Sequence, residues 1–210
     1  MRKSQDSAGS LIPEQLTLPG LKKAAADCKA CDLWENATQT VFGEGKRSAT
    51  VLFIGEQPGN DEDLQGKPFV GPAGRLLDQA LEEAGIDRRQ TYVTNVVKHF
   101  KWEPRGKRRI HKKPNTTEIQ ACRPWLEAEI ATVKPRVIVC LGATAAQTLL
   151  GRDIRVSRQR GQLIPSPLAP AVIATVHPSS ILRAPDERSR HLEMQLFISD
   201  LKIVADTLSE

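Results

Sequence analysis

The stretch TVLFI at residues 50–54, followed by GEQPG at residues 55–59, decides the fold. A short run of apolar and β-branched residues that ends at a glycine is typical of a strand buried on both faces. In open parallel sheets, ligands bind beyond the carboxyl ends of the strands. We therefore expect a buried parallel strand here, with a binding site beside the turn that follows it.

Apolar runs and segments with helical periodicity alternate along the rest of the chain. Asn115, with Glu118 three residues later, is a capping box that predicts the start of one helix. This alternation predicts an α/β protein, a three-layer α/β/α sandwich with a central, mostly parallel four-stranded sheet. The expected strands are residues 50–54, 92–97, 137–141 and 171–176, and the expected helices are residues 75–84, 115–133, 143–150 and 187–208.

The bulk composition indicates one domain. A chain of 210 residues with 40% hydrophobic content can bury a single core, so we expect one domain over residues 21–210. Residues 1–20 are predicted to be a polar, poorly ordered lead without the apolar segment of a secretory signal. No apolar run approaches the roughly 18–20 residues that span a membrane. These features together predict a cytosolic protein.

Positive charge is concentrated in residues 98–113, KHFKWEPRGKRRIHKK, which hold eight Lys/Arg and one acid. The whole chain has a net charge of +5, so the other 194 residues sum to −2. Such local basicity is typical of a loop that meets a polyanion. His111 in this segment is either a solvated histidine of a phosphate-binding loop or a nucleophile. Phe100 and Trp102 either stack on bases or anchor the loop, and we favour anchoring.

The four cysteines are open to two interpretations. Cys28 and Cys31 form a CxxC pair before the first strand, whereas Cys122 lies in a helix and Cys140 at the end of a strand. They could be buried core residues, because free cysteine often behaves as a small apolar side chain. They could also be thiolate ligands of zinc or of an iron–sulfur cluster. The spacing alone does not choose between these alternatives.

Polar residues occur where three of the expected strands end. Glu56 and Gln57 follow the first strand, Asn95 lies in the second, and His177 in HPSS follows the last. Because the carboxyl ends of parallel strands meet at one edge, we expect one crevice there. Structural alternatives remain open for each: a loop carboxylate that caps backbone amides, an asparagine paired within its strand, and a tight turn at HPSS.

Several motifs together resemble one family. GEQPG (55–59), GKPFVGPAGRLLD (66–78), YVTNVVK (92–98) and HPSS (177–180) resemble the iron–sulfur, family 4, uracil-DNA glycosylases. KRRIH (107–111) resembles the UdgX branch, which cross-links to uracil-containing DNA. Gln57 points to the same branch, because conventional members resemble GEAPG. The resemblance covers roughly residues 25–205. It implies the uracil-DNA glycosylase fold, uracil-containing DNA as the partner, and a [4Fe–4S] cluster on Cys28, Cys31, Cys122 and Cys140. We accordingly expect a monomer in the bacterial cytoplasm, associated with the nucleoid when it is bound to DNA.

The resemblance also favours roles for the residues at the strand ends. A target base must leave the stack, and its face and edge are then read in a pocket. Phe69, otherwise a core residue, is expected to stack on uracil, and the Asn95 carboxamide to read its edge. His177 is expected to donate to uracil O2 as charge develops on the leaving base. Glu56 is expected to stabilise the oxocarbenium-like sugar, and Gln57 to contact uracil and assist catalysis.

His111 is expected to be the nucleophile of this branch. The neighbouring cations disfavour the imidazolium and so keep the ring neutral. They also bind flanking phosphates and hold the ring near C1′, where it captures the sugar after uracil leaves. The protein would then stop after one turnover. The residues expected to contact phosphates are Lys107, Arg108, Arg109, Ser179, Ser180 and Arg183.

Three other functions remain open on the sequence. In the first, the protein is an ordinary glycosylase with multiple turnovers, and His111 only contacts phosphate. In the second, it is a non-catalytic iron–sulfur module that recognises DNA lesions. In the third, it is a zinc-stabilised scaffold. The combination of Glu56, Asn95 and His177 argues against simple binding, which does not need all three.

Overall fold

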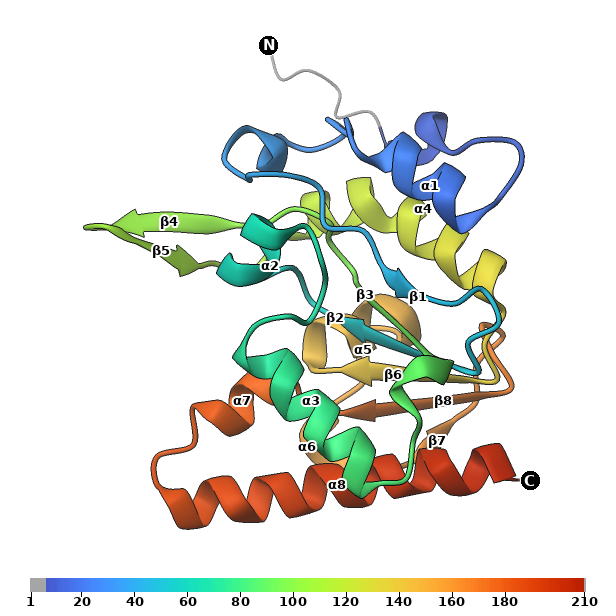
Figure 1. The fold of residues 1–210 in the computed structure, drawn as a ribbon, viewed down its shortest axis with the longest axis vertical. Coiled ribbons are helices and arrows are strands. Elements are labelled where there is room, and N and C mark those ends of the chain that lie inside the picture. The colour runs from blue at the N-terminus through green and yellow to red at the C-terminus, as the bar shows by residue number, and fades with distance from the viewer. Residues whose placement is uncertain (1–6, 210) are drawn as a thin grey trace.

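The computed structural model describes residues 7–209, and its centre is a sheet of six strands in the order β1-β3-β2-β6-β8-β7 (Figure 1). The four inner strands run parallel to one another, as predicted. Two edge strands of two residues each pair antiparallel and were not predicted, because two residues cannot show an alternating pattern. The strands are β1 (Glu44–Gly45), β2 (Val51–Gly55), β3 (Thr91–Asn95), β6 (Val137–Leu141), β7 (Leu163–Ile164) and β8 (Ala171–Thr175).

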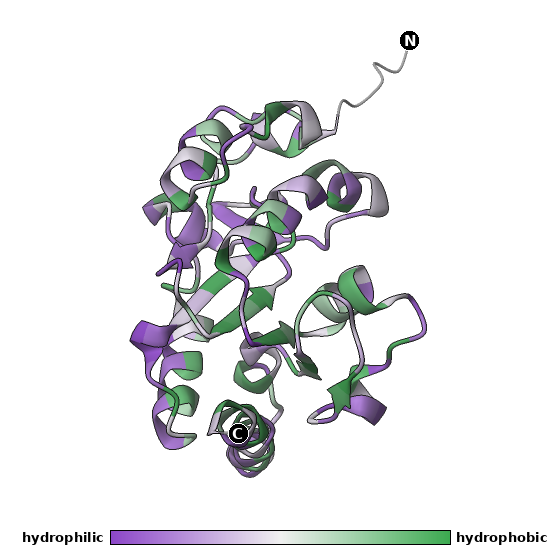
Figure 2. Ribbon diagram, turned by 90° about the vertical axis from the view of Figure 1, so that its right-hand side faces the viewer, coloured by the Kyte–Doolittle hydropathy of each residue, from purple (hydrophilic) through white to green (hydrophobic). Residues whose placement is uncertain are grey.

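Helices cover both faces of the sheet, which confirms the three-layer prediction (Figure 1). Leu52 and Ile54 of β2 pack in the core beneath the first helical layer, whereas Val51 and Phe53 pack beneath the second. Figure 2 shows the resulting hydrophobic strands between helices that carry hydrophilic outer surfaces. The first layer is α1 (Leu18–Ala25), α4 (Thr116–Val133) and α5 (Ala143–Leu150), and the second is α3 (Pro72–Glu83), α7 (Pro178–Leu182) and α8 (Glu187–Ser209).

The start and end of α4 follow from its terminal residues. The Asn115 side chain accepts a hydrogen bond from the Glu118 N–H at 2.9 Å, and Glu118 Oε2 accepts one from the Asn115 N–H at 2.7 Å. Lys134 ends the helix in the left-handed region at φ 52°, immediately before Pro135. The predicted capping box is therefore confirmed. The remaining short helices are α2 (Asn60–Gln65), α6 (Val156–Gln159), η1 (Ala8–Leu11), η2 (Asp32–Glu35) and η3 (Arg88–Gln90).

The basic segment forms a hairpin rather than the predicted loop. β4 (Trp102–Arg105) and β5 (Arg108–His111) pair antiparallel around a turn at Gly106, whose φ is +60°. The hairpin projects beyond the carboxyl ends of the sheet strands (Figure 1). It places His111 at the end of β5, opposite Trp102.

The predicted poorly ordered lead is wrong for residues 7–20. Ser7 caps η1, whose Ala8 is fully buried, and Thr17 caps α1, which buries Leu21. Packing of η1 against α4 therefore ties this region to the core. Residues 1–6 lie outside the described part of the chain. Between residues 7 and 209, no helix has both the length and the apolar character that crossing a membrane requires.

Candidate active site at the carboxyl ends of the strands

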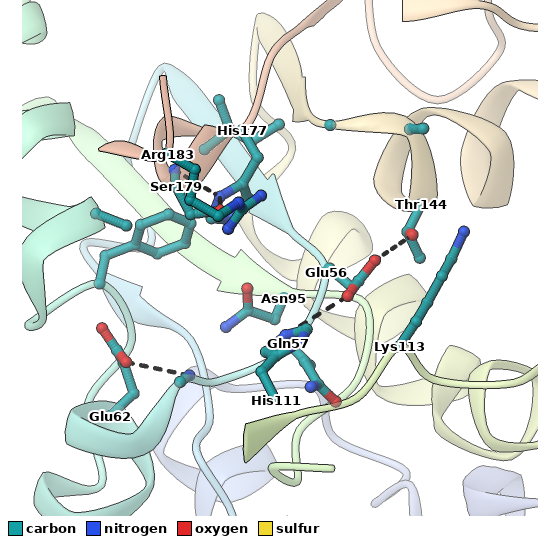
Figure 3. Close-up of a pocket in the computed structure, with 16 residues that line it drawn as sticks. Glu56, Gln57, Glu62, Asn95, His111, Lys113, Thr144, His177, Ser179 and Arg183 are labelled. Atoms are coloured by element: carbon teal, nitrogen blue, oxygen red, sulfur yellow. Dashed lines mark hydrogen bonds and ion pairs between the residues drawn. The ribbon is translucent and has the colours of Figure 1, made fainter. Parts of the chain in front are cut away.

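A cavity of about 650 Å³ lies at the carboxyl ends of β2, β3, β6 and β8 (Figure 3). It is lined by most of the side chains that the sequence singled out. The expected residues that line it are Glu56, Gln57, Phe69, Asn95, His111, His177, Ser179 and Arg183. The prediction that separate loops share one crevice is therefore confirmed.

Three of these side chains converge on Gly55 at the end of β2. A Cβ atom at this position would lie 2.4 Å from Asn95 Oδ1, 2.9 Å from Phe69 Cζ and 3.4 Å from His177 Nε2. A larger residue would therefore push into all three. Glycine is required here because the backbone forms the floor between an amide, an aromatic ring and an imidazole.

Asn95 presents a free carboxamide to the cavity. Asn95 is 3% exposed, and within residues 7–209 no group forms a hydrogen bond with its side-chain amide. Its backbone carbonyl, in contrast, accepts a hydrogen bond from Lys98 Nζ at 2.7 Å. Lys98 is itself buried and forms an ion pair with Glu129 at 2.5 Å. The alternative of an asparagine paired within its strand does not hold, and the carboxamide is available to a ligand.

Phe69 lies beside His177 with ring centroids 6.0 Å apart and an interplanar angle of 28°. Its backbone occupies the left-handed region at φ 57°, which costs roughly 1–2 kcal/mol for a residue with a side chain. Gly74 of α3 permits this path, because a Cβ there would lie 1.7 Å from the Phe69 carbonyl oxygen. Strain of this kind, held by surrounding structure, is typical of functional sites.

His177 presents a neutral N–H donor to the cavity. Its Nδ1 accepts a hydrogen bond from the Ser179 backbone N–H at 3.1 Å and lies 2.8 Å from the Ser179 hydroxyl. An accepting Nδ1 leaves the proton of the neutral ring on Nε2. Burial lowers the pKa of His177 to about 4, assisted by the charge of Arg183 and by repulsion from His111 when that ring is protonated. The ring is therefore uncharged at neutral pH, with Nε2–H directed toward Gly55.

His111 and Glu56 meet at the cavity, where His111 Nε2 lies 3.6 Å from Glu56 Oε1 (Figure 3). The other Glu56 oxygen accepts a hydrogen bond from the Thr144 hydroxyl. Burial is the main cause that lowers the pKa of His111 below 6.5; Glu56 opposes this shift and Arg183 adds to it. The direction of this pKa shift agrees with the predicted neutral ring. The predicted cause was repulsion from the cations of the basic segment, and these are not among the causes of the shift.

Gln57 holds the hairpin rather than facing a ligand with its amide. Its Nε2 donates to the carbonyl oxygens of Lys101 at 3.1 Å and Lys112 at 3.0 Å. Its Oε1 accepts from the Lys101 N–H at 3.1 Å. The same side chain thus joins both strands of the hairpin to the loop after β2. These contacts give Gln57 a positioning role, and its predicted catalytic and uracil-contacting roles stay predictions.

The cations of the hairpin differ in their environments. Lys107 and Arg108 are exposed at the turn, as expected for phosphate contacts. Arg109 instead points inward, with Nη1 2.6 Å from Asp63 Oδ2 and its guanidinium 5.4 Å from the centre of the Phe100 ring. This ion pair already neutralises the Arg109 charge, and the predicted role of Arg109 in phosphate binding stays a prediction.

The aromatic residues of the hairpin anchor it, as the sequence analysis favoured. Phe100 is 1% exposed, and the Trp102 indole donates to the Asn36 carbonyl oxygen at 2.8 Å. At HPSS, Ser180 is exposed and its hydroxyl donates to the His177 carbonyl oxygen at 2.8 Å. Phosphate contacts by Ser179, Ser180 and Arg183 stay predictions.

All four cysteines are buried and lie in one core cluster. Cys122 Sγ accepts a hydrogen bond from the Lys98 N–H at 3.2 Å, and Cys28 Sγ one from the Trp125 indole at 3.3 Å. Burial raises the pKa of Cys31 to about 11 and those of Cys122 and Cys140 to about 12. Such thiols stay protonated unless a bound cation stabilises the thiolate.

The four cysteines offer four thiol donors, which a single metal ion and an iron–sulfur cluster would use in different arrangements. Among residues 7–209, no three His, Cys, Asp or Glu side chains lie close enough to hold one metal ion. One tetrahedral zinc would require all its ligands to converge on a point. In a [4Fe–4S] cluster the four thiolates bind four different iron atoms, so the sulfurs lie further apart. Hydrogen bonds to the sulfurs, as at Cys28 and Cys122, are also a feature of such sites.

Three further polar side chains that were not predicted as site residues also line the cavity: Glu62, Lys113 and Thr144. Glu62 is buried and accepts hydrogen bonds from the Gly71 N–H at 2.7 Å and the Gly59 N–H at 3.1 Å. It thus joins the GEQPG loop to the loop that carries Phe69. Thr144 holds Glu56, and Lys113 lies at the cavity edge. Glu62 three residues after Gly59 gave a capping signal, Lys113 was marked only as one cation of the basic segment, and Thr144 gave no signal.

The comparison with known families agrees with this fold and site. A family model described as the uracil DNA glycosylase superfamily matches residues 42–202, and the chain belongs to this superfamily. It is 40% identical over 169 residues to a type-4 uracil-DNA glycosylase of Thermotoga maritima, covering 80% of this chain and 84% of the relative. It is 35% identical over 182 residues to a type-4 uracil-DNA glycosylase of Archaeoglobus fulgidus, covering 83% and 88%.

Proposed function

We propose that this protein excises uracil from DNA and then bonds His111 to C1′ of the remaining sugar. The observation that carries this proposal is the His111–Glu56 pair, which lies on the same cavity as the free Asn95 carboxamide and the neutral His177 donor. The type-4 relatives support the excision step by their names. The position of His111 on a hairpin over the cavity supports the second step.

Uracil would be read by an amide and an aromatic ring. The unpaired Asn95 carboxamide offers a donor and an acceptor, which match the O4 and N3–H of uracil but not the amino group of cytosine. Phe69 would stack on the base. Burial of both groups excludes water, which strengthens the discrimination because unpaired polar groups are costly there.

Bond cleavage would move an electron pair from the glycosidic bond to uracil N1. The His177 Nε2–H would donate to uracil O2 and stabilise the developing anion. The sugar would become an oxocarbenium-like cation, which the Glu56 carboxylate stabilises. Thr144 keeps that carboxylate oriented through its hydroxyl.

The imidazole of His111 would then donate a nitrogen lone pair to C1′. Its lowered pKa leaves the lone pair free near pH 7, so no base is needed to activate the ring. The new C–N bond makes the ring cationic, and the adjacent Glu56 carboxylate compensates this charge. Without an efficient route to hydrolysis of this bond, the protein would stop after one event.

The four buried cysteines would hold a [4Fe–4S] cluster, on the opposite face of the sheet from Phe69. The cluster, when bound, would supply a cross-link between the N-terminal segment, α4 and β6. This role is structural and leaves the chemistry of excision to the cavity residues.

The substitution His111→Ser tests the proposal. We expect it to abolish the SDS-resistant adduct with a uracil-containing oligonucleotide while uracil release continues with multiple turnovers, because water can then reach the cation. An adduct that persists in this variant would exclude His111 as the linking residue. A wild-type protein that releases many uracils per molecule would instead select the ordinary turnover glycosylase.

A further inference from the structure

Residues 36–41, here called the strap, connect the cysteine pair to the hairpin that carries His111. The strap begins one residue after η2, and η2 begins immediately after Cys31. The Asn36 carbonyl oxygen accepts a hydrogen bond from the Trp102 indole at 2.8 Å. Thr38 Oγ1 accepts one from Arg109 Nη1 at 3.2 Å. Two points of the strap thus contact both strands of the hairpin.

Thr38 closes a network that fixes the hairpin over α2. Its backbone N–H donates to Asp63 Oδ1 at 2.9 Å, and its hydroxyl donates to Asp63 Oδ2 at 2.6 Å. Asp63 also holds Arg109 at 2.6 Å and is fully buried. Hydrogen bonds to a buried charge are among the stronger ones in proteins, so Thr38 restrains the position of Arg109.

The far end of the strap contacts the base of the hairpin and the CxxC segment. The Val41 N–H donates to the Lys98 carbonyl oxygen at 2.8 Å. Thr40 Oγ1 lies 2.9 Å from His99 Nε2 and donates to the Ala26 carbonyl oxygen at 3.3 Å. Ala26 precedes Cys28 by two residues. Each end of the strap is therefore attached both to the cysteine segment and to the hairpin.

We propose that the strap is a positioning element, through which the cysteine site sets the place of His111 and thereby controls covalent trapping separately from uracil excision. The groups assigned to excision, Glu56, Asn95 and His177, follow or end strands of the central sheet and have no contact with the strap. Gln57 also holds the hairpin, so loss of the strap should loosen it rather than release it. This inference rests on the proposed function of His111.

The substitution Thr38→Val tests the proposal because it removes the hydroxyl and keeps the shape of the side chain. Thr117→Val, at an exposed threonine in the first turn of α4, is the matched control. We expect Thr38→Val to slow adduct formation about tenfold, from the loss of hydrogen bonds to charged groups. Uracil release should change less than about twofold, and trypsin should cut the native protein faster at Arg105, Lys107 and Arg108. The control should match the wild type in all three measurements.

The substitution Cys28→Ser tests the link to the cysteine site with the same protease measurement. We expect faster cleavage in the hairpin and in the N-terminal segment that the cluster would hold, together with weaker absorbance near 400 nm. Cleavage throughout the chain would overturn the proposal, because the cysteine site would then support the whole fold.

Two results with Thr38→Val would also overturn the proposal. In the first, adduct formation and trypsin cleavage are both the same as in the wild type. In the second, adduct formation and uracil release fall by the same factor. The protease result needs no adduct. If the wild type never forms one, the proposed function fails while the restraint of the hairpin by the strap is still measured.

Discussion

His111 Nε2 lies 3.6 Å from Glu56 Oε1, so a residue of the hairpin meets a carboxylate that follows a strand of the central sheet.

The substitution Glu56→Gln keeps the size of the Glu56 side chain and removes its charge. We expect adduct formation to slow by about 100-fold, because both the oxocarbenium and the cationic imidazole product lose their counter-charge. The rate of SDS-resistant adduct measures this. Glu103→Gln removes an exposed carboxylate of the hairpin and is the control; an equal loss there would argue against a specific role for Glu56.

The pH dependence of trapping should follow the neutral form of His111. Burial and Arg183 hold its pKa below 6.5, so the rate should be constant from about pH 7 to 8. It should fall only as the pH drops below 6.5 through this lowered pKa, because protonation removes the lone pair. Arg183→Gln should move the fall to higher pH, whereas Glu56→Gln should move it to lower pH. A rate that increases in acid would contradict a neutral nucleophile.

The fold could be predicted because its signals are local. The run at residues 50–54 is apolar on both faces, and the Asn115–Glu118 capping box lies within four residues. The members of the cavity could also be predicted, because parallel strands bring their carboxyl ends to one edge. The contacts that those side chains make could not be predicted. Arg109 finds Asp63 46 residues away, and a basic run does not reveal which of its charges turns inward.

The hydrogen-bond partners of Gln57 could not be predicted from the sequence either, because they lie 44 and 55 residues along the chain.

The substitution Gln57→Ala removes three hydrogen bonds to the hairpin backbone and leaves the Glu56 side chain in place. We expect trapping to fall at least tenfold and excision much less, because only His111 depends on the hairpin. Adduct yield and uracil release from the same reaction measure this ratio. Gln65→Ala, at an exposed residue of α2, is the control. Equal losses of trapping and excision would show that Gln57 acts on uracil itself.

The cations at the hairpin turn should affect binding to DNA differently from Arg109. Lys107→Ala with Arg108→Ala removes two exposed charges, and each phosphate contact contributes about 0.9 to the slope of log K against log salt. We expect this double variant to weaken binding to any sequence and to lower the slope by up to about 2. Arg109→Ala should leave the slope unchanged, because Asp63 already neutralises that guanidinium, and should slow trapping by loosening the hairpin. Fluorescence anisotropy with a labelled oligonucleotide across a salt series measures both slopes. A lower slope for Arg109→Ala would mean that its side chain leaves Asp63 for the DNA backbone, and an unchanged slope for the double variant would place the turn away from it.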